Sequence, residues 1–234
     1  MSRWLIELNG ETFDIDEFPF WFPAGPIHAI KEDGKVFLTG SAFQTLHEPA
    51  QVHASAVQIL DECFAIISLL QANLQKPSIG AVIHEADDGT RSGAVFMTGT
   101  AVGRSKVRAV SLGPPGARTQ AQELLLASRR DRRLQIAAFL LSNHAVTWPH
   151  LYRCLEEIES FLGRKVHEAG FCSANQRERF TRSANSAEVS GNDARHAVGR
   201  FDPPPNPMSL KDACGFLSQL MQAVLSNVAK SLSP

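Results

Sequence analysis

The chain has 234 residues, of which 44% are hydrophobic and 20% are charged, as is ordinary for a globular protein. Its formal net charge of −1 gives no overall field that would draw it to nucleic acid or to an anionic membrane. The N-terminus lacks the apolar run of a secretory signal, and residues 64–70, the longest apolar run near the middle, are far short of the ~20 residues that span a bilayer. We therefore expect a soluble, cytoplasmic protein.

The first half of the chain has the pattern of strands around one helix. Turn signals such as Asn9-Gly10 and Asp33-Gly34 lie between short apolar segments and predict hairpins. The expected strands are residues 4–8, 12–15, 27–30, 36–39, 79–84, 94–102 and 107–112. Between them, apolar residues spaced three or four apart predict one long helix from Pro49 to just before Pro77. Residues 1–113 are therefore predicted to form an α+β domain with a mostly antiparallel sheet and one long helix.

An aromatic cluster follows the first predicted strands, with four rings within five residues. Prolines at positions 19, 23 and 26 exclude a central strand there, so we expect a loop. The rings either cap the hydrophobic core, which is the favoured interpretation, or form a contact surface for a partner or a ligand. They belong to Phe18, Phe20, Trp21 and Phe22.

The second half of the chain has helical patterns to its end. The sequence GPPG at residues 113–116 predicts a boundary, so residues 118–234 are expected to form a helical domain. Asp131 interrupts the apolar pattern of residues 124–141, so either the helix breaks there or Asp131 pairs with a neighbouring arginine. The last helix is predicted to begin at Ser209 and to bury one face. That face consists of Leu210, Ala213, Leu217, Leu220, Val224 and Val228.

The polar stretch of residues 185–207 is the longest part without a helical or strand period. It holds adjacent Arg195 and His196, a pair that could bind an anion and transfer protons. Asp193 could orient the imidazole, so these three residues are the candidate catalytic group. The alternative is that the polar side chains of this loop satisfy its own backbone.

A cluster of arginines lies just before this loop. Arg177, Arg179 and Arg182 can share one helix edge, and with Arg200 they are candidate phosphate-binding residues. A solvated helix face is the alternative explanation. No CxxC pair and no pair of histidines at helical spacing appears, so we expect neither a metal nor a cofactor.

Several helices with an Arg and a His near a helix junction resemble the HEPN superfamily of helical domains. The resemblance covers residues 118–232 and rests on Asn185, Asp193, Arg195 and His196, although Arg and His stand four to six residues apart in that family and are adjacent here. It implies either a metal-independent RNase of a defence or toxin system or an inactive dimerisation module.

Two functions are therefore expected from the sequence. The first is a non-enzymatic interaction or regulatory module, with a protein partner or a second copy of the chain. The second is a HEPN-like RNase or nucleic-acid-binding protein that uses Arg195 and His196 and binds RNA. Neither expectation includes a membrane as partner.

Overall fold

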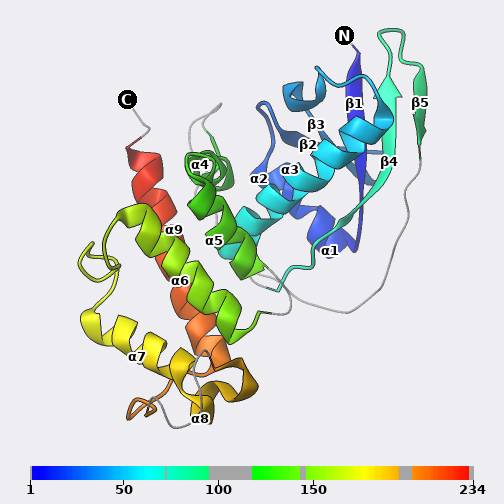
Figure 1. The fold of residues 1–234 in the computed structure, drawn as a ribbon. Coiled ribbons are helices and arrows are strands. Elements are labelled where there is room, and N and C mark those ends of the chain that lie inside the picture. Colours follow the sequence, from blue (N-terminus) through cyan, green and yellow to red (C-terminus); the bar gives the residue numbers. More distant parts are fainter. Residues whose placement is uncertain (1, 72, 95–117, 143–145, 195–201, 232–234) are drawn as a thin grey trace. The chain divides into compact units, whose positions relative to one another are not determined.

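The computed structural model of this chain describes residues 2–71, 73–94, 118–142, 146–194 and 202–231 (Figure 1). The chain divides into two compact units, residues 1–122 and residues 123–234. The predicted class is confirmed, because an antiparallel sheet with one long helix precedes a helical C-terminal region. The GPPG sequence expected at the boundary lies outside the described residues.

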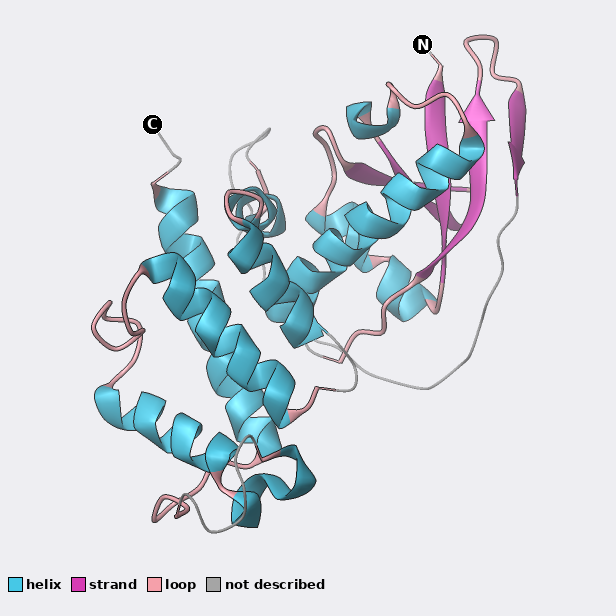
Figure 2. Cartoon of the chain, in the orientation of Figure 1, coloured by secondary structure: helices cyan, strands magenta, loops and turns pink. Residues whose placement is uncertain are grey.

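The first unit contains a five-stranded sheet in the order β2-β3-β1-β4-β5, drawn in magenta in Figure 2. Every strand pair is antiparallel, and β1 lies in the centre, with Ile6 opposite Leu38 of β3 and Arg3 opposite Glu85 of β4. The order places the β2-β3 hairpin on one side of β1 and the β4-β5 hairpin on the other. The strands are β1 (Arg3–Asn9), β2 (His28–Glu32), β3 (Lys35–Thr39), β4 (Ser78–Glu85) and β5 (Arg91–Ala94).

The long helix α3 (Pro49–Leu70) packs against this sheet and contacts β1 and β4 (Figure 1). Side chains alternate between the faces of a strand, and in β1 the face made of Trp4, Ile6 and Leu8 is buried. By length and composition alone, α3 is long and apolar enough to cross a membrane, a criterion that core helices of soluble proteins also meet. In this structure 56% of its most apolar stretch is buried. The predicted start at Pro49 and the helical spacing are confirmed, but the helix ends at Leu70, several residues before the predicted end near Pro77.

The expected strand at residues 12–15 is wrong, because the chain forms α1 (Thr12–Ile15) there. The loop expected at the aromatic cluster is wrong in part, because its first residues belong to α2 (Glu17–Trp21). Both edges of β1 are already occupied by β3 and β4, so the chain cannot return beside β1 as a hairpin strand. The segment also includes part of the aromatic cluster. Three of the four rings are buried, which confirms that they contribute to the core: Phe18, Trp21 and Phe22.

The second unit is built from helices, and α5, α6 and α9 contact one another. The boundary between the units falls within α4. Within residues 185–207, expected to lack regular structure, the described part forms the short helix α8 and one 3₁₀ turn, η2 (Gly191–Asp193). The α-helices are α4 (Gln120–Ser128), α5 (Arg132–Ser142), α6 (Trp148–Leu162), α7 (Ala174–Asn185), α8 (Ala187–Ser190) and α9 (Leu210–Lys230).

Local signals set several helix ends in this unit. Ser173 and Gln176 form a reciprocal capping box at α7, and Ser209 with Asp212 does the same at α9. At residue 131 the helix breaks and the acid is also paired, so both predicted alternatives hold. The helix α4 ends before Asp131, and the carboxylate of Asp131 forms an ion pair with Arg133.

The predicted inner face of α9 is buried in its middle, whereas Leu210 and Val228, at its two ends, are not buried. Ala213, Leu217, Leu220 and Val224 are at most 3% exposed, whereas Leu210 is 38% exposed. Leu210 is the first residue of the helix, directly after the N-cap, where the chain is still approaching from the proline-rich segment. The helical period therefore predicted the middle of the buried face correctly and extended it too far at both ends.

Candidate functional site

The candidate catalytic group from the sequence is only partly within the described residues. Asp193 ends the η2 turn and is half-buried, whereas Arg195 and His196 lie outside the described residues, as does Arg200. Their assignment as a catalytic or phosphate-binding group therefore stays a prediction.

Arg177, a predicted phosphate-binding residue, binds Glu159 of α6 through both ends of its guanidinium group. Its Nε lies 2.5 Å from Oε1 of Glu159 and its Nη2 lies 2.9 Å from Oε2. The same carboxylate accepts from Lys165 Nζ at 3.1 Å and from the backbone N–H of Val166 at 3.2 Å. Burial raises the pKa of Glu159, but the hydrogen bonds from Arg177, Val166 and Lys165 outweigh it, so the net pKa is lowered. Arg177 thus holds α7 to α6.

Arg179 and Arg182 bind the backbone of the proline-rich segment, residues 202–207. Nε of Arg179 donates to the carbonyl of Asn206 at 2.5 Å, and Nη2 of Arg182 donates to the carbonyl of Pro203 at 3.1 Å. Prolines have no N–H group, so such a segment is rich in carbonyl oxygens and poor in donors. The arginines supply the missing donors, and the segment is thereby fastened to α7.

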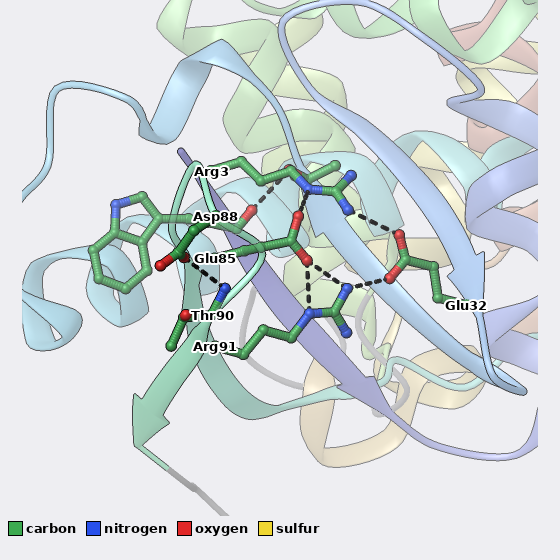
Figure 3. A network of polar contacts seen from close by, with 8 residues as sticks. Arg3, Glu32, Glu85, Asp88, Thr90 and Arg91 are labelled. Atoms are coloured by element: carbon green, nitrogen blue, oxygen red, sulfur yellow. Dashed lines mark hydrogen bonds and ion pairs between the residues drawn. The ribbon is translucent and has the colours of Figure 1, made fainter. Parts of the chain in front are cut away.

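The first unit carries a closed ring of four charged side chains on the sheet (Figure 3). Arg3 donates to Glu85 at 2.7 Å and to Glu32 at 3.0 Å, and Arg91 donates to each of the same two carboxylates at 2.6 Å. The four residues come from β1, β2, β4 and β5, so the ring links four of the five strands. Arg3 alternates with the buried Trp4 along β1, which places the ring on the other face of the sheet.

The ring makes the stability of the fold depend on pH. The hydrogen bond from Arg91 lowers the pKa of Glu32 more than burial raises it, and the hydrogen bonds from Arg3 and Arg91 lower the pKa of Glu85. A lowered pKa in the folded state means that the stabilisation is complete above the unfolded pKa of about 4.3 and is lost as the pH falls through the folded pKa.

We expect Glu32→Gln to destabilise the protein above about pH 5 and to have little effect at the lowest pH at which the fold persists. Urea unfolding at a series of pH values would measure this difference. Asp202→Asn, at an exposed carboxylate of the second unit, is the control and should shift stability little at any pH. An equal loss for Glu32→Gln at all pH values would show that the carboxylate charge does not stabilise the ring.

A half-open pocket of about 680 Å³ lies where β1 begins, and we call it the Trp4 pocket. Its apolar lining comes from Trp4, Leu46 and Pro49. The Trp4 indole donates from Nε1 to the carbonyl of Leu46 at 3.0 Å, and its ring lies 4.8 Å from the imidazole of His84, tilted by 57°. These contacts fix the indole in one orientation.

The rest of the Trp4 pocket is lined mainly by polar side chains. Five of them have no hydrogen-bond partner for the side chain among the residues that the structure describes: Ser2, Gln44, His47, His84 and Ser92. Arg3 and Asp87 complete the lining. Groups of this kind, gathered over an apolar surface, are available to a ligand.

The sequence patterns did not indicate the Trp4 pocket. His84 faces Trp4 and Ser92 only because β1, β4 and β5 pair in this register, and that register brings together residues about 80 positions apart. His47 stands six residues from His53, a spacing that does not place both side chains on one helix face. Within the described residues, no group of three or more His, Cys, Asp or Glu side chains could hold a metal ion.

The chain matches no protein-family model, and comparisons with curated proteins and with solved structures also give no match. The resemblance to the HEPN superfamily therefore stays a prediction.

Proposed function

We propose that this chain is a non-enzymatic interaction or regulatory module whose α+β unit binds a ligand in the Trp4 pocket. The observation that carries the proposal is the set of five polar side chains that line the pocket without a hydrogen-bond partner among the described residues. Polar groups that lie over an apolar surface and have no internal partner supply both the affinity and the orientation that a ligand needs.

The size and lining of the pocket support the same proposal. Its volume of about 680 Å³ lies within the range of about 300–1,000 Å³ that is usual for small-molecule sites. Trp4 is 7% exposed and held by its hydrogen bond to Leu46, so this wall exists before a ligand arrives. A preformed wall lowers the entropic cost of binding.

The contacts of α7 favour this proposal over RNA binding. Arg177 binds a buried carboxylate, and Arg179 and Arg182 bind backbone carbonyls of the chain itself. A phosphate would have to displace these contacts before it could use the same guanidinium groups. A HEPN-like RNase that uses Arg195 and His196 stays a prediction that rests on residues outside the described part of the chain.

The proposal is tested by blocking the pocket. Ser92 lies opposite His84 in the sheet, so Ser92→Phe should place a ring in the pocket without touching the core. A library of small polar compounds would be screened by NMR, following the three indole N–H signals, of which Trp4→Phe identifies one. We expect compounds that shift the Trp4 signal and that lose binding in Ser92→Phe.

Ala54→Phe is the matched control, because it adds the same ring on the exposed side of α3. It should bind the same compounds as the unmodified chain. If no compound shifts the Trp4 signal, or if Ser92→Phe binds them as well as Ala54→Phe does, the proposal is wrong.

A further inference from the structure

We propose that one end of the second unit binds single-stranded nucleic acid through three exposed arginines, Arg130, Arg132 and Arg164. We call this surface the arginine end. The proposal goes beyond the proposed function, because it concerns a different unit from the Trp4 pocket and does not depend on that pocket. Four observations support it: the packing of α5 on α6, the exposure of the three guanidinium groups, the pairing of the nearby acids, and the choice of arginine over lysine.

The packing of α5 against α6 brings together the two helix ends that carry these arginines. Arg133, near the start of α5, donates from Nη1 to the carbonyl of Ser160, near the end of α6, at 2.8 Å. Further along α5, the carbonyl of Ala137 lies 3.6 Å from Sγ of Cys154, which stands earlier in α6. Residue numbers rise along one helix as they fall along the other, so the two helices are antiparallel. The start of α5 and the end of α6 therefore lie side by side (Figure 1).

The three arginines are exposed at this end and have no acidic partner among the residues that the structure describes. Arg130 lies between α4 and α5, Arg132 begins α5, and Arg164 follows Gly163, the C-cap of α6. The guanidinium of Arg132 donates to the neutral amide of Gln135 at 3.2 Å. Each of the three thus keeps its positive charge and most of its donors for a partner. The arginines of α7 differ, because they bind groups of the chain itself.

The acids of this end are mostly neutralised by other cations. The carboxylate of Asp131 accepts from Nη2 of Arg133 at 2.6 Å, and that of Glu159 accepts from both ends of the Arg177 guanidinium. Glu168 is exposed in the loop after α6 and contributes one negative charge. The positive charge at the arginine end therefore exceeds the negative charge that remains to balance it, and an anionic partner is attracted there.

The chemistry of the free cations favours a nucleic acid over other anionic partners. All three are arginines, whereas the neighbouring Lys165 is bound to Glu159 at 3.1 Å. A guanidinium group binds a phosphate through two parallel hydrogen bonds, and its flat face also stacks on a base. A single strand offers both phosphates and unstacked bases, so it uses both properties. A lipid headgroup offers phosphate without a base, and an acidic peptide offers neither.

The first arm of the test measures binding of the full chain to two fluorescently labelled single-stranded RNAs of unrelated sequence, each of about 20 nucleotides. Fluorescence anisotropy should give the same affinity for both within about twofold, because phosphate contacts and stacking do not depend strongly on sequence. Three phosphate contacts give a slope of about −2 for the logarithm of affinity against that of salt concentration. Raising the salt from about 50 to about 200 mM should therefore weaken binding about 20-fold.

The second arm uses three matched variants, each with three substitutions at exposed positions. Replacing all arginines of the arginine end with glutamine should weaken RNA binding about 30-fold at about 50 mM salt. Replacing them with lysine keeps the charge but removes the planar group, so it should weaken binding about fivefold. The control loses the same charge at dispersed positions, through Lys35→Gln, Arg153→Gln and Lys211→Gln, and should weaken binding by less than about threefold.

Each outcome supports or overturns the proposal. It is overturned if neither RNA binds at about 50 mM salt, if the glutamine variant binds as tightly as the control, or if the lysine variant binds as tightly as the unmodified chain. Vesicles of phosphatidylserine and polyglutamate are added as competitors. If either displaces the RNA at an equal concentration of negative charge, the arginine end recognises a membrane or an acidic protein instead, and the proposal is wrong.

Discussion

Replacing Leu217 with alanine is expected to lower the free energy of unfolding by about 2–5 kcal/mol. Leu217 has no exposed surface and lies in the middle of α9, on the face that packs toward α5 and α6. Alanine would leave a cavity that the surrounding side chains can only partly fill, and the cost of such a cavity depends on how far they relax. Urea unfolding followed by far-ultraviolet circular dichroism would measure the loss.

Lys211 provides the control on the same helix. It is exposed in the first turn of α9, and Lys211→Ala should change the free energy of unfolding by no more than about 0.5 kcal/mol. A Leu217→Ala variant as stable as the unmodified chain would mean that α9 does not form part of a packed core. The proline-rich segment, which leads directly into α9, would then be held in place only by Arg179 and Arg182 of α7.

Replacing Arg177 with methionine is expected to cost about 2–4 kcal/mol. The guanidinium makes two of the four hydrogen bonds that Glu159 accepts, and the Glu159 side chain is only 9% exposed. Without Arg177 the carboxylate keeps Lys165 and the Val166 N–H but loses its main counter-charge. Removing one partner of a fully buried ion pair costs about 3–5 kcal/mol, and the cost should be somewhat lower here because Arg177 is itself 20% exposed.

Arg153→Met on α6 is the matched control for that change. Arg153 is 60% exposed and lies 3.5 Å from Glu157, one helical turn away, so its loss should cost less than about 1 kcal/mol. The double variant Arg177→Met with Glu159→Gln should recover part of the stability, because no buried charge is then left unpaired and the amide oxygen can still accept from the N–H of Val166. If the double variant were as unstable as the sum of both single changes, the charge pair would not be the cause.

Patterns within single helices determined much of this fold from the sequence alone. The apolar positions of α3 and α9 recur every three or four residues, and the capping pairs Ser173 with Gln176 and Ser209 with Asp212 lie three residues apart. Such signals act over one or two turns of the chain, so they can be identified without knowledge of the tertiary structure. The antiparallel sheet was likewise indicated by hairpin turns between short apolar segments.

Only the tertiary structure decided the conformation of residues 12–15 and the contacts that make up the candidate site. The turn at Asn9-Gly10 favours a hairpin locally, but β3 and β4 occupy both edges of β1, so the segment becomes α1. The charged ring and the Trp4 pocket join residues brought together by strand register: Arg3 and Glu85 are 82 positions apart. No local pattern specifies such a pair, because the register depends on which faces of several strands are buried together. The partners of the α7 arginines also depended on the tertiary structure. Their spacing indicated a shared helix edge, but it could not show that they bind a buried carboxylate and the carbonyls of the proline-rich segment, because those contacts form only when the chain folds back.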